Sequence, residues 1–368
     1  TRKESSAASD VYKRQGYEGL GKLVEEYGFK KVVLVGGKRA LAAVSQKIRD
    51  GLKGSSIEVL GEFVYGHECT LNNINALMEK EEVQKADVIF AVGGGKALDT
   101  GKVLAGFLNK PSMSFPTICS NCAGGTAIAV VYNDDGSFLR YELIPAPVHM
   151  FVEVETIAEA PEKYFWAGIG DGLSKQPEVL FATKGLEDLD FVANMGVSIA
   201  KTCQEPFLKY GEEGLKDVRE NRASKAVEEV ATDILVNTGY VSNLTNGDNY
   251  YYNSSLAHVF YNVSTSVKRE GEYLHGVLVS YGVLVLHAYD KNYEEFEKLA
   301  RFNKNLGLPV TLEEIGLTRD DVREMAKKVY ETTEWQKSEK ALSEEKFVEA
   351  AFYADDFGCL LYTSDAAD

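Results

Sequence analysis

Positive charge is in short supply in this sequence. Its 368 residues include 40 lysines and arginines against 56 aspartates and glutamates, which leaves a formal net charge of −16. Nucleic acids and anionic membrane surfaces are bound by basic patches. Long apolar runs are missing too, since none approaches the roughly 18–20 residues that cross a bilayer. We therefore expect no nucleic-acid or membrane partner.

Cysteine and histidine are equally rare, with five residues of each. So few cysteines argue against a disulfide framework and favour a reducing compartment, and we expect a cytoplasmic protein. Hydrophobic residues make up 45% and charged residues 26% of the chain, as in an ordinary globular protein. At this length the chain can form two domains, each with its own core.

The two ends read differently from the rest. The segments SSAASDVYKRQ (5–15) and CLLYTSDAAD (359–368) can be written as translations of the two strands of one oligonucleotide in different frames. We interpret residues 1–15 and 359–368 as adapter-derived tails and leave them out of the fold prediction.

Two patterns alternate over the first 155 residues. Apolar, β-branched runs predict strands at 30–37, 57–60, 86–92 and 112–118. Helix-like stretches lie between them at 38–53, 71–84 and 97–108. A hairpin is expected over 127–144, with Asp135-Gly136 at its turn. Helical patterns dominate afterwards, so we expect an α/β domain with a parallel sheet over 16–160 and an all-helical domain over 161–358.

One glycine turn follows a predicted strand in residues 86–102, ADVIFAVGGGKALDTGK. A strand, a tight glycine turn and a helix start can hold a phosphate, because the helix N-terminus presents free N–H groups. The spacing matches neither the P-loop nor the G-x-G-x-x-G pattern. A ligand site is one interpretation, since open α/β sheets bind ligands at the carboxyl ends of their strands. A tight turn without a ligand is the other.

The helical half holds two histidines 17 residues apart, His258 and His275, and a carboxylate in an apolar setting, Asp171. Two neutral imidazoles and one carboxylate suit Zn²⁺ or Fe²⁺, and three protein ligands leave positions open for a substrate. An isolated histidine on an apolar helix is, however, more often a satisfied core residue than a metal ligand. The local sequence ranks the other histidines no lower: His67, His149 and His287.

The segment PTICSNCAGGT (116–126) follows a predicted strand and is rich in small and hydroxyl side chains. Cys119 and Cys122 could be nucleophiles or metal ligands. No basic residue nearby supports an activated thiolate, so packing of small residues beside a ligand is the favoured interpretation.

Six motifs together resemble the iron-containing (group III) alcohol dehydrogenase superfamily, in its branch similar to glycerol dehydrogenase and hydroxycarboxylate dehydrogenase. In chain order they are GGGKALDTGK, PTI.S, AIAVVYNDDG, APEKYFWAGIGDGLSK, LAHVFYN and YLHGVLVSYG. The resemblance runs from about Gly16 to Gly358. It implies a Rossmann-like dinucleotide-binding α/β domain, an all-α C-terminal domain (the dehydroquinate-synthase-like architecture), NAD or NADP, and one divalent metal, Zn or Fe. We also expect a homo-oligomer.

The resemblance implies a set of site residues. The metal ligands, which act in catalysis through the metal, would be Asp171, His258 and His275. The pyrophosphate would bind at the turn formed by Gly93, Gly94, Gly95 and Lys96, with Asp99 fixing that turn and its helix. The positions matching the nicotinamide half of the site are Thr117, Ser120, Thr126, Ile128 and Tyr132.

Three departures from the family pattern bear on function. Glycerol dehydrogenases carry a polyol-binding aspartate where this chain has Cys122. The hydroxycarboxylate-dehydrogenase-like relatives have a cysteine at that position, as this chain does. Tyr261 stands where relatives have another histidine, and Pro177 should break or kink the helix that carries Asp171. A 2-oxo or 2-hydroxy acid is therefore as open a substrate as a polyol.

The choice of cofactor is open as well. NAD-preferring members carry an aspartate where this chain has Gly37, followed by Lys38 and Arg39. Such an acid hydrogen-bonds the ribose 2′-hydroxyl and repels a 2′-phosphate, so its loss and the two cations should allow NADP. Alternatively, both cations are simply solvated at a helix start.

These features predict a metal-dependent NAD(P) oxidoreductase that transfers hydride between nicotinamide and a small alcohol, polyol or 2-hydroxy acid. A dehydroquinate-synthase-like lyase is the alternative from another reaction class, although no basic cluster accompanies the ligand motifs. A nicotinamide- and metal-binding protein without turnover, inactivated through Tyr261 and Pro177, is the third.

Overall fold

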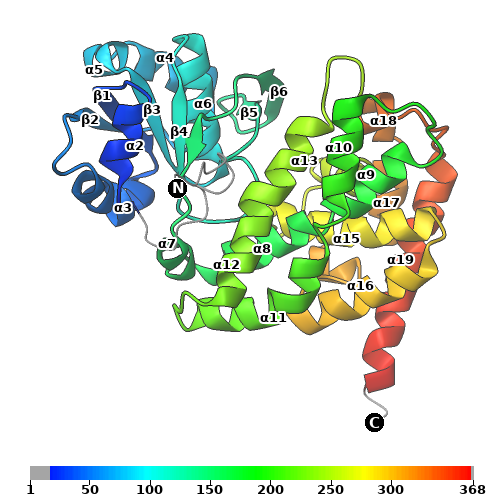
Figure 1. Cartoon of the computed structure of the whole chain (residues 1–368). Coiled ribbons are helices and arrows are strands. Elements are labelled where there is room, and N and C mark those ends of the chain that lie inside the picture. The colour runs from blue at the N-terminus through cyan, green and yellow to red at the C-terminus, as the bar shows by residue number, and fades with distance from the viewer. Residues whose placement is uncertain (1–16, 366–368) are drawn as a thin grey trace. The chain divides into compact units, whose positions relative to one another are not determined.

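The computed structural model describes residues 17–365, with side chains to residue 363 (Figure 1). Contacts within the chain group residues 17–165 with 216–239 in one compact unit, and 166–215 with 240–365 in another. The domain limits drawn from the sequence stay a prediction. The predicted tail 1–15 lies outside the described residues, whereas 359–365 form the end of helix α19.

The first unit is built on a five-stranded parallel sheet in the order β2-β1-β3-β4-β7 (Figure 1). Its strands are β1 (Lys31–Gly36), β2 (Glu58–Val64), β3 (Val88–Gly93), β4 (Ser112–Pro116) and β7 (His149–Met150). The four predicted strands are confirmed. The two-residue β7 was not predicted.

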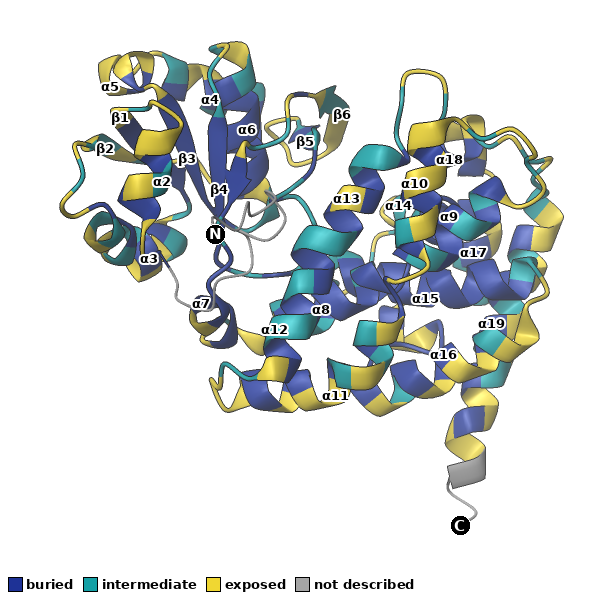
Figure 2. Cartoon of the chain, viewed as in Figure 1, coloured by how far each residue is buried: buried dark blue, intermediate teal, exposed yellow. Residues whose placement is uncertain are grey.

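Helices cover both faces of this sheet because its central strands are apolar on both faces. In β1, Val32 and Leu34 pack into one core, while Val33 and Val35 pack into a second core on the opposite face. Figure 2 shows the central strands β3 and β4 as buried. This arrangement confirms the predicted parallel α/β fold.

The helices of the first unit follow the predicted pattern with two differences. They are α2 (Leu20–Glu26), α3 (Lys38–Gly51), α4 (Leu71–Met78), α5 (Glu81–Lys85), α6 (Gly95–Phe107), α7 (Val154–Ala158) and α12 (Lys225–Thr232), followed by a π-helical turn, Asp233–Asn237. The stretch predicted as one helix over 71–84 is two helices, because the backbone is extended at Lys80. Helix α2 was not predicted.

The sheet has a switch point between β1 and β3. The chain runs from β1 outward to β2 and then returns to place β3 on the other side of β1. Open α/β sheets bind ligands beyond the carboxyl ends of the strands at such a point. Both strands end there in glycine turns, and a Cβ on Gly93 would lie 3.8 Å from the amide nitrogen of Gly37. The two turns are therefore neighbours.

The predicted hairpin is also confirmed. Strands β5 (Ile128–Tyr132) and β6 (Phe138–Leu143) pair antiparallel. At the turn, Gly136 has φ +84°, a left-handed conformation that glycine adopts without strain. Oδ1 of Asp135 accepts the N–H of Ser137 at 2.9 Å and closes the turn.

The second unit is helical, as predicted. Its helices are α8 (Glu162–Gly172), α9 (Lys175–Thr183), α10 (Phe191–Ala200), α11 (Glu205–Arg219), α13 (Thr238–Leu244), α14 (Leu256–Ser264), α15 (His275–Tyr289), α16 (Tyr293–Leu306), α17 (Arg319–Ala326), α18 (Thr333–Gln336) and α19 (Glu344–Asp365), with 3₁₀ turns at Glu313–Ile315 and Val329–Glu331; α8, α11 and α13 each have one end in the first unit. Helix α15 is buried continuously from Gly276 to Ala288, so it forms the centre of this unit. Among the described helices, none has the length and apolar character needed to cross a membrane.

Candidate functional site

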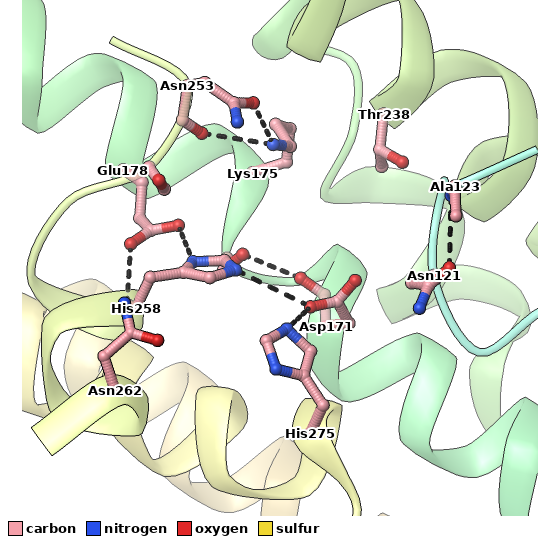
Figure 3. A network of polar contacts seen from close by, with 12 residues as sticks. Asn121, Ala123, Asp171, Lys175, Glu178, Thr238, Asn253, His258, Asn262 and His275 are labelled. Carbon is pink, nitrogen blue, oxygen red and sulfur yellow. Dashed lines mark hydrogen bonds and ion pairs between the residues drawn. The ribbon is translucent and has the colours of Figure 1, made fainter. Parts of the chain in front are cut away.

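Three predicted ligands come together from three helices of the second unit (Figure 3). Asp171 lies in the last turn of α8, His258 in the first turn of α14, and His275 is the first residue of α15. Oδ1 of Asp171 lies 3.0 Å from Nε2 of His275 and 3.9 Å from Nε2 of His258. One ligand atom from each of the three residues lies within 4.8 Å of the other two.

The remaining histidines do not join them. Within residues 17–365 the structure contains no second group of three or more His, Cys, Asp or Glu with ligand atoms this close. His67 is in an exposed turn, and His149 is buried in the first unit. Burial lowers the pKa of His287 to about 4, as for a neutral core histidine.

Glycines allow the helices of this site to approach closely. A Cβ on Gly276 would lie 1.8 Å from the carbonyl oxygen of Ala167, so α8 and the start of α15 are in backbone contact. This contact places Asp171 beside His275. A Cβ on Gly282 would lie 2.4 Å from a main-chain oxygen of α14, so α15 also crosses α14 without a gap.

The electrostatics of the site stabilise a negative carboxylate. Burial would raise the pKa of Asp171, but the charges of His275, His258 and Lys175 outweigh it and hold this pKa below its usual range. The side chain of His275 is 35% exposed, against 14% for Asp171 and 18% for His258. The site is therefore most open on the side of His275.

A fourth side chain, Glu178 in α9, contacts His258 at Nδ1, the ring nitrogen other than the one near Asp171. Its Oε2 lies 2.7 Å from Nδ1 of His258, and its Oε1 accepts the N–H groups of Ser255 and His258. Burial would raise the pKa of Glu178, but its contacts with His258 and these N–H groups lower it. The sequence prediction missed this residue, because its contact with His258 joins two helices that are far apart in the sequence.

Pro177 lies just after the break between helices α8 and α9. The predicted break is confirmed, since α8 ends at Gly172 and α9 begins at Lys175. Pro177 falls in the first turn of α9, where its missing N–H would have no partner within the helix. The chain can therefore present Asp171 and Glu178 from two separate helices.

The arrangement fits a divalent cation. Oδ1 of Asp171 is buried and receives no hydrogen bond of good geometry from the described residues. A neutral His258 that donates Nδ1–H to Glu178 has its Nε2 lone pair on the side of this oxygen. Lone pairs that converge in this way need a cation between them, and Zn²⁺ and Fe²⁺ accept two imidazoles and a carboxylate. The residues present therefore fit the metal that the resemblance implies.

The predicted phosphate turn lies at the start of α6 in the first unit. Gly93 ends β3 with φ +140°, Gly94 precedes the helix and Gly95 begins it. A Cβ on Gly94 would lie 2.5 Å from Ile118, so the loop after β4 lies directly over the turn. The N–H of Thr117 donates to the oxygen of Gly93 at 3.1 Å.

Lys96 is held at the edge of this turn. Its Nζ lies 2.6 Å from a carboxylate oxygen of Glu68 and 5.4 Å from the centre of the Tyr132 ring. The structure therefore brings Lys96, Tyr132 and the glycine turn into one region of the first unit.

Asp99 anchors its own helix, α6, to the neighbouring hairpin. Its Oδ2 accepts the N–H of Val130 at 3.1 Å, and its Oδ1 lies 2.9 Å from Nζ of Lys102. Lys102 is fully buried and donates to the main-chain oxygens of Thr126 and Ile128. This buried ion pair anchors α6, the helix that Asp99 was expected to fix together with the glycine turn, to the start of β5.

Comparisons with known proteins agree with this architecture. Residues 11–161 match the family described as iron-containing alcohol dehydrogenase. Hydroxycarboxylate dehydrogenase A of Escherichia coli is 31% identical over 305 residues, which cover 82% of this chain and 82% of the relative. The chain belongs to the iron-containing alcohol dehydrogenase family. Within it, the chain falls in the branch of glycerol dehydrogenases and hydroxycarboxylate dehydrogenase A.

Solved structures of other proteins share the fold. Glycerol dehydrogenase from Schizosaccharomyces pombe superposes with a TM-score of 0.80 at 24% identity, covering 95% of this chain and 90% of that chain. Sulfoacetaldehyde reductase from Bifidobacterium kashiwanohense, solved in complex with NAD⁺, superposes with a TM-score of 0.71 at 14% identity, covering 92% of this chain and 94% of that one.

Tyr261, the departure from the family's histidine, packs against the site. Its ring centre lies 4.1 Å from that of His275, at an interplanar angle of 80°. This edge-to-face contact is a favourable arrangement for two aromatic rings. Tyr261 therefore contacts a ligand of the candidate metal site through its ring.

The positions that bear on cofactor and substrate choice lie in turns of the first unit. Gly37 follows β1 and precedes α3, with φ −72°. Ser120 and Cys122 lie in the loop between β4 and β5. Cys119 in the same loop is 1% exposed, and burial raises the pKa of its thiol, so a reactive thiolate is disfavoured.

Proposed function

We propose that this protein is a metal-dependent NAD(P) oxidoreductase that transfers hydride between nicotinamide and a small alcohol, polyol or 2-hydroxy acid, or the matching carbonyl. The observation that carries the proposal is the convergence of Asp171, His258 and His275 around an oxygen that no hydrogen bond of good geometry satisfies. Membership of a family of dehydrogenases supports it.

The three side chains would hold one divalent cation, Zn²⁺ or Fe²⁺. When bound, such a cation stabilises an alkoxide and polarises a carbonyl, which is the chemistry that hydride transfer from an alcohol or to a carbonyl requires. Asp171 supplies the negative charge of the ligand set. Glu178 keeps the Nδ1 side of His258 occupied, so that Nε2 is the nitrogen available as a ligand.

The glycine turn at the start of α6 would hold the pyrophosphate of the dinucleotide. The free N–H groups of the first helical turn attract anions, and the glycines let the phosphates approach the backbone. The position at the β1/β3 switch point supports this role. Thr117, Ser120, Thr126, Ile128 and Tyr132 would line the nicotinamide half. Lys102 and Asp99 anchor the part of this segment that carries Thr126 and Ile128.

The first unit supports use of both NAD and NADP. Gly37 leaves the ribose 2′ position without a repelling carboxylate, and Lys38 and Arg39 start the helix beside it. The NAD⁺ complex of the sulfoacetaldehyde reductase supports a nicotinamide cofactor in this fold.

For the substrate, we propose an anionic 2-oxo or 2-hydroxy acid ahead of glycerol. Cys122 puts a neutral side chain where glycerol dehydrogenases carry an aspartate, so an anionic substrate meets no repulsion from that position. The similarity to hydroxycarboxylate dehydrogenase A agrees with this preference.

A substrate panel tests the proposal. The protein is loaded with Zn²⁺ or Fe²⁺ and offered 2-oxo acids, aldehydes, diols and glycerol, with NADH or NADPH for the carbonyls and NAD⁺ or NADP⁺ for the alcohols. We expect net oxidation or reduction of nicotinamide with at least one class, and loss of that turnover with a chelator. Stoichiometric binding of metal and nicotinamide without net turnover on the whole panel would contradict the proposal.

A further inference from the structure

We propose that Glu178 is the positioning residue of the metal centre: it fixes His258 as the Nδ1–H tautomer and at the same time caps helix α14. This inference rests on the proposed metal site, but it concerns a residue outside the ligand set. It follows from the three hydrogen bonds that the carboxylate of Glu178 makes with Ser255 and His258. Figure 3 shows Glu178 beside the ring of His258.

The N–H groups at the start of α14 need hydrogen-bond acceptors from outside the helix. Ser255 precedes the helix, but its side chain accepts no hydrogen bond from the first helical turn. The N–H of His258 needs an acceptor there, because the first four N–H groups of a helix have none within it. Oε1 of Glu178 supplies one at 3.0 Å and also accepts the N–H of Ser255 at 2.7 Å. Glu178 thus caps α14 from a different helix.

The other carboxylate oxygen of Glu178, Oε2, faces the ring of His258. Because two main-chain N–H groups hold Oε1, the carboxylate cannot rotate, and Oε2 faces Nδ1 of His258 at 2.7 Å. A carboxylate can only accept a hydrogen bond, so Nδ1 must carry the proton. The lone pair of a neutral His258 is then on Nε2, the nitrogen that lies 3.9 Å from Oδ1 of Asp171.

Other residues already anchor α14 and the segment before it. Lys175 holds the segment before α14 by donating to the main-chain and side-chain oxygens of Asn253. Glu334, a second buried carboxylate, accepts from Asn262 within α14 at 3.0 Å. Neither of them bonds the ring of His258. The role of Glu178 in setting the ring can therefore be separated from general support of the helix.

Glu178→Gln tests the inference, with Glu334→Gln as the matched control. The amide oxygen of the new side chain can keep both main-chain hydrogen bonds, which leaves its NH₂ group facing Nδ1 as a donor. Nδ1 would then become the acceptor and the proton would move to Nε2. We expect the affinity for Zn²⁺ to fall about 10–100-fold, as for other residues that orient a metal ligand. Glu334→Gln should stay within about threefold of the natural protein, because Glu334 does not bond the ring.

The tautomer is read directly from the ¹⁵N spectrum of histidine in the metal-free full chain, above the pKa of the ring. The signals of His258 are assigned by their loss in His258→Asn. We expect Nδ1–H in the natural protein and in Glu334→Gln, and Nε2–H in Glu178→Gln. If Glu178→Gln fails to fold, the spectrum of the natural protein alone decides, since Nε2–H there overturns the inference.

The outcomes separate this inference from the proposed function. An unchanged Zn²⁺ affinity and an unchanged tautomer in folded Glu178→Gln overturn the inference and leave the proposed function standing. The expected tautomers and loss of affinity, in a protein that turns over nothing on the substrate panel, support the inference and contradict the proposed function.

Discussion

Oδ1 of Asp171 lies 3.0 Å from Nε2 of His275, and no described residue gives this oxygen a hydrogen bond of good geometry. His258 brings a second imidazole nitrogen to the same oxygen from another helix. A cation between these atoms is the simplest way to satisfy all three.

Replacement of His258 or His275 by alanine should abolish turnover and lower the metal content. Each imidazole is one of only three candidate ligands, and two ligands bind a divalent cation much more weakly than three. Metal per chain and NAD(P)H turnover are measured together. His67→Ala, in an exposed turn, is the control and should match the natural protein. Full activity in either ligand variant would refute the metal assignment.

Gly37→Asp should shift the preference toward NAD. The new carboxylate would hydrogen-bond a ribose 2′-hydroxyl and repel a 2′-phosphate. Residue 37 has φ −72°, and the nearest atom to a Cβ there is 3.6 Å away on Tyr65, so the side chain fits. We expect the ratio of kcat/KM for NADH over NADPH to rise about tenfold, or roughly 1.4 kcal/mol. Gly37→Asn separates charge from size, and an unchanged ratio in Gly37→Asp would count against the cofactor argument.

Cys122→Asp should weaken the use of 2-oxo acids. A carboxylate at this position would repel the carboxylate of the substrate, and like charges brought together cost several kcal/mol in a binding site. We expect the KM for a 2-oxo acid to rise at least about tenfold, while Cys122→Asn stays close to the natural protein. Improved use of 2-oxo acids by Cys122→Asp would show that the account of this pocket is wrong.

Lys102→Met should destabilise the first unit. The substitution leaves Asp99 buried without its cation, and breaking a buried ion pair costs about 3–5 kcal/mol. The double variant Asp99→Asn/Lys102→Met removes the uncompensated charge and should recover part of the loss. Urea unfolding measures both. Equal stability of the natural protein and Lys102→Met would mean that the pair does not anchor α6 to β5.

Asp233 makes stability depend on pH. It lies in the π-helical turn, and burial raises its pKa to about 8, with Glu229 adding to the shift and a hydrogen bond from Asn237 opposing it. The folded protein therefore holds a proton that the unfolded chain releases near pH 4. The stability that the protonated Asp233 contributes is fully present below about pH 4 and is lost as the pH rises through about 8.

Asp233→Asn should remove this dependence. The amide is neutral at every pH and keeps the size of the side chain. Thermal unfolding at pH 5 and pH 9 is expected to give a similar Tm for variant and natural protein at pH 5, and a higher Tm for the variant at pH 9. A natural protein that is more stable than the variant at pH 9 would contradict the assignment of a neutral Asp233.

Much of the fold could be predicted because its signals are local. The strands β1 and β3 carry unbroken apolar runs, since helices cover both of their faces, and the hairpin turn has its glycine where the backbone is left-handed. The division of residues 71–84 into α4 and α5 could not be predicted, because both halves carry the same helical pattern. The two-residue β7 is a strand only through its pairing with β4.

The candidate site could not be predicted from the local sequence. Each histidine, taken alone, is compatible with a core as well as with a metal, and only the resemblance to a family selected His258 and His275. The roles of Glu178 and Asp99 depend on tertiary packing. Glu178 reaches His258 because α9 starts afresh at Lys175, and Asp99 faces β5 through the placement of α6 on the sheet. Neither contact is a property of the local sequence.

The most direct test of the central claim follows one preparation through removal and return of its metal. The rate of NADH or NADPH consumption with a 2-oxo acid is measured in the loaded protein, after chelation and dialysis, and after addition of one equivalent of Zn²⁺ or Fe²⁺ per chain. A metal-dependent oxidoreductase should lose its rate with the metal and regain it with the metal, and this is the result that we expect. A rate that persists in protein shown by elemental analysis to be free of divalent metal would contradict it.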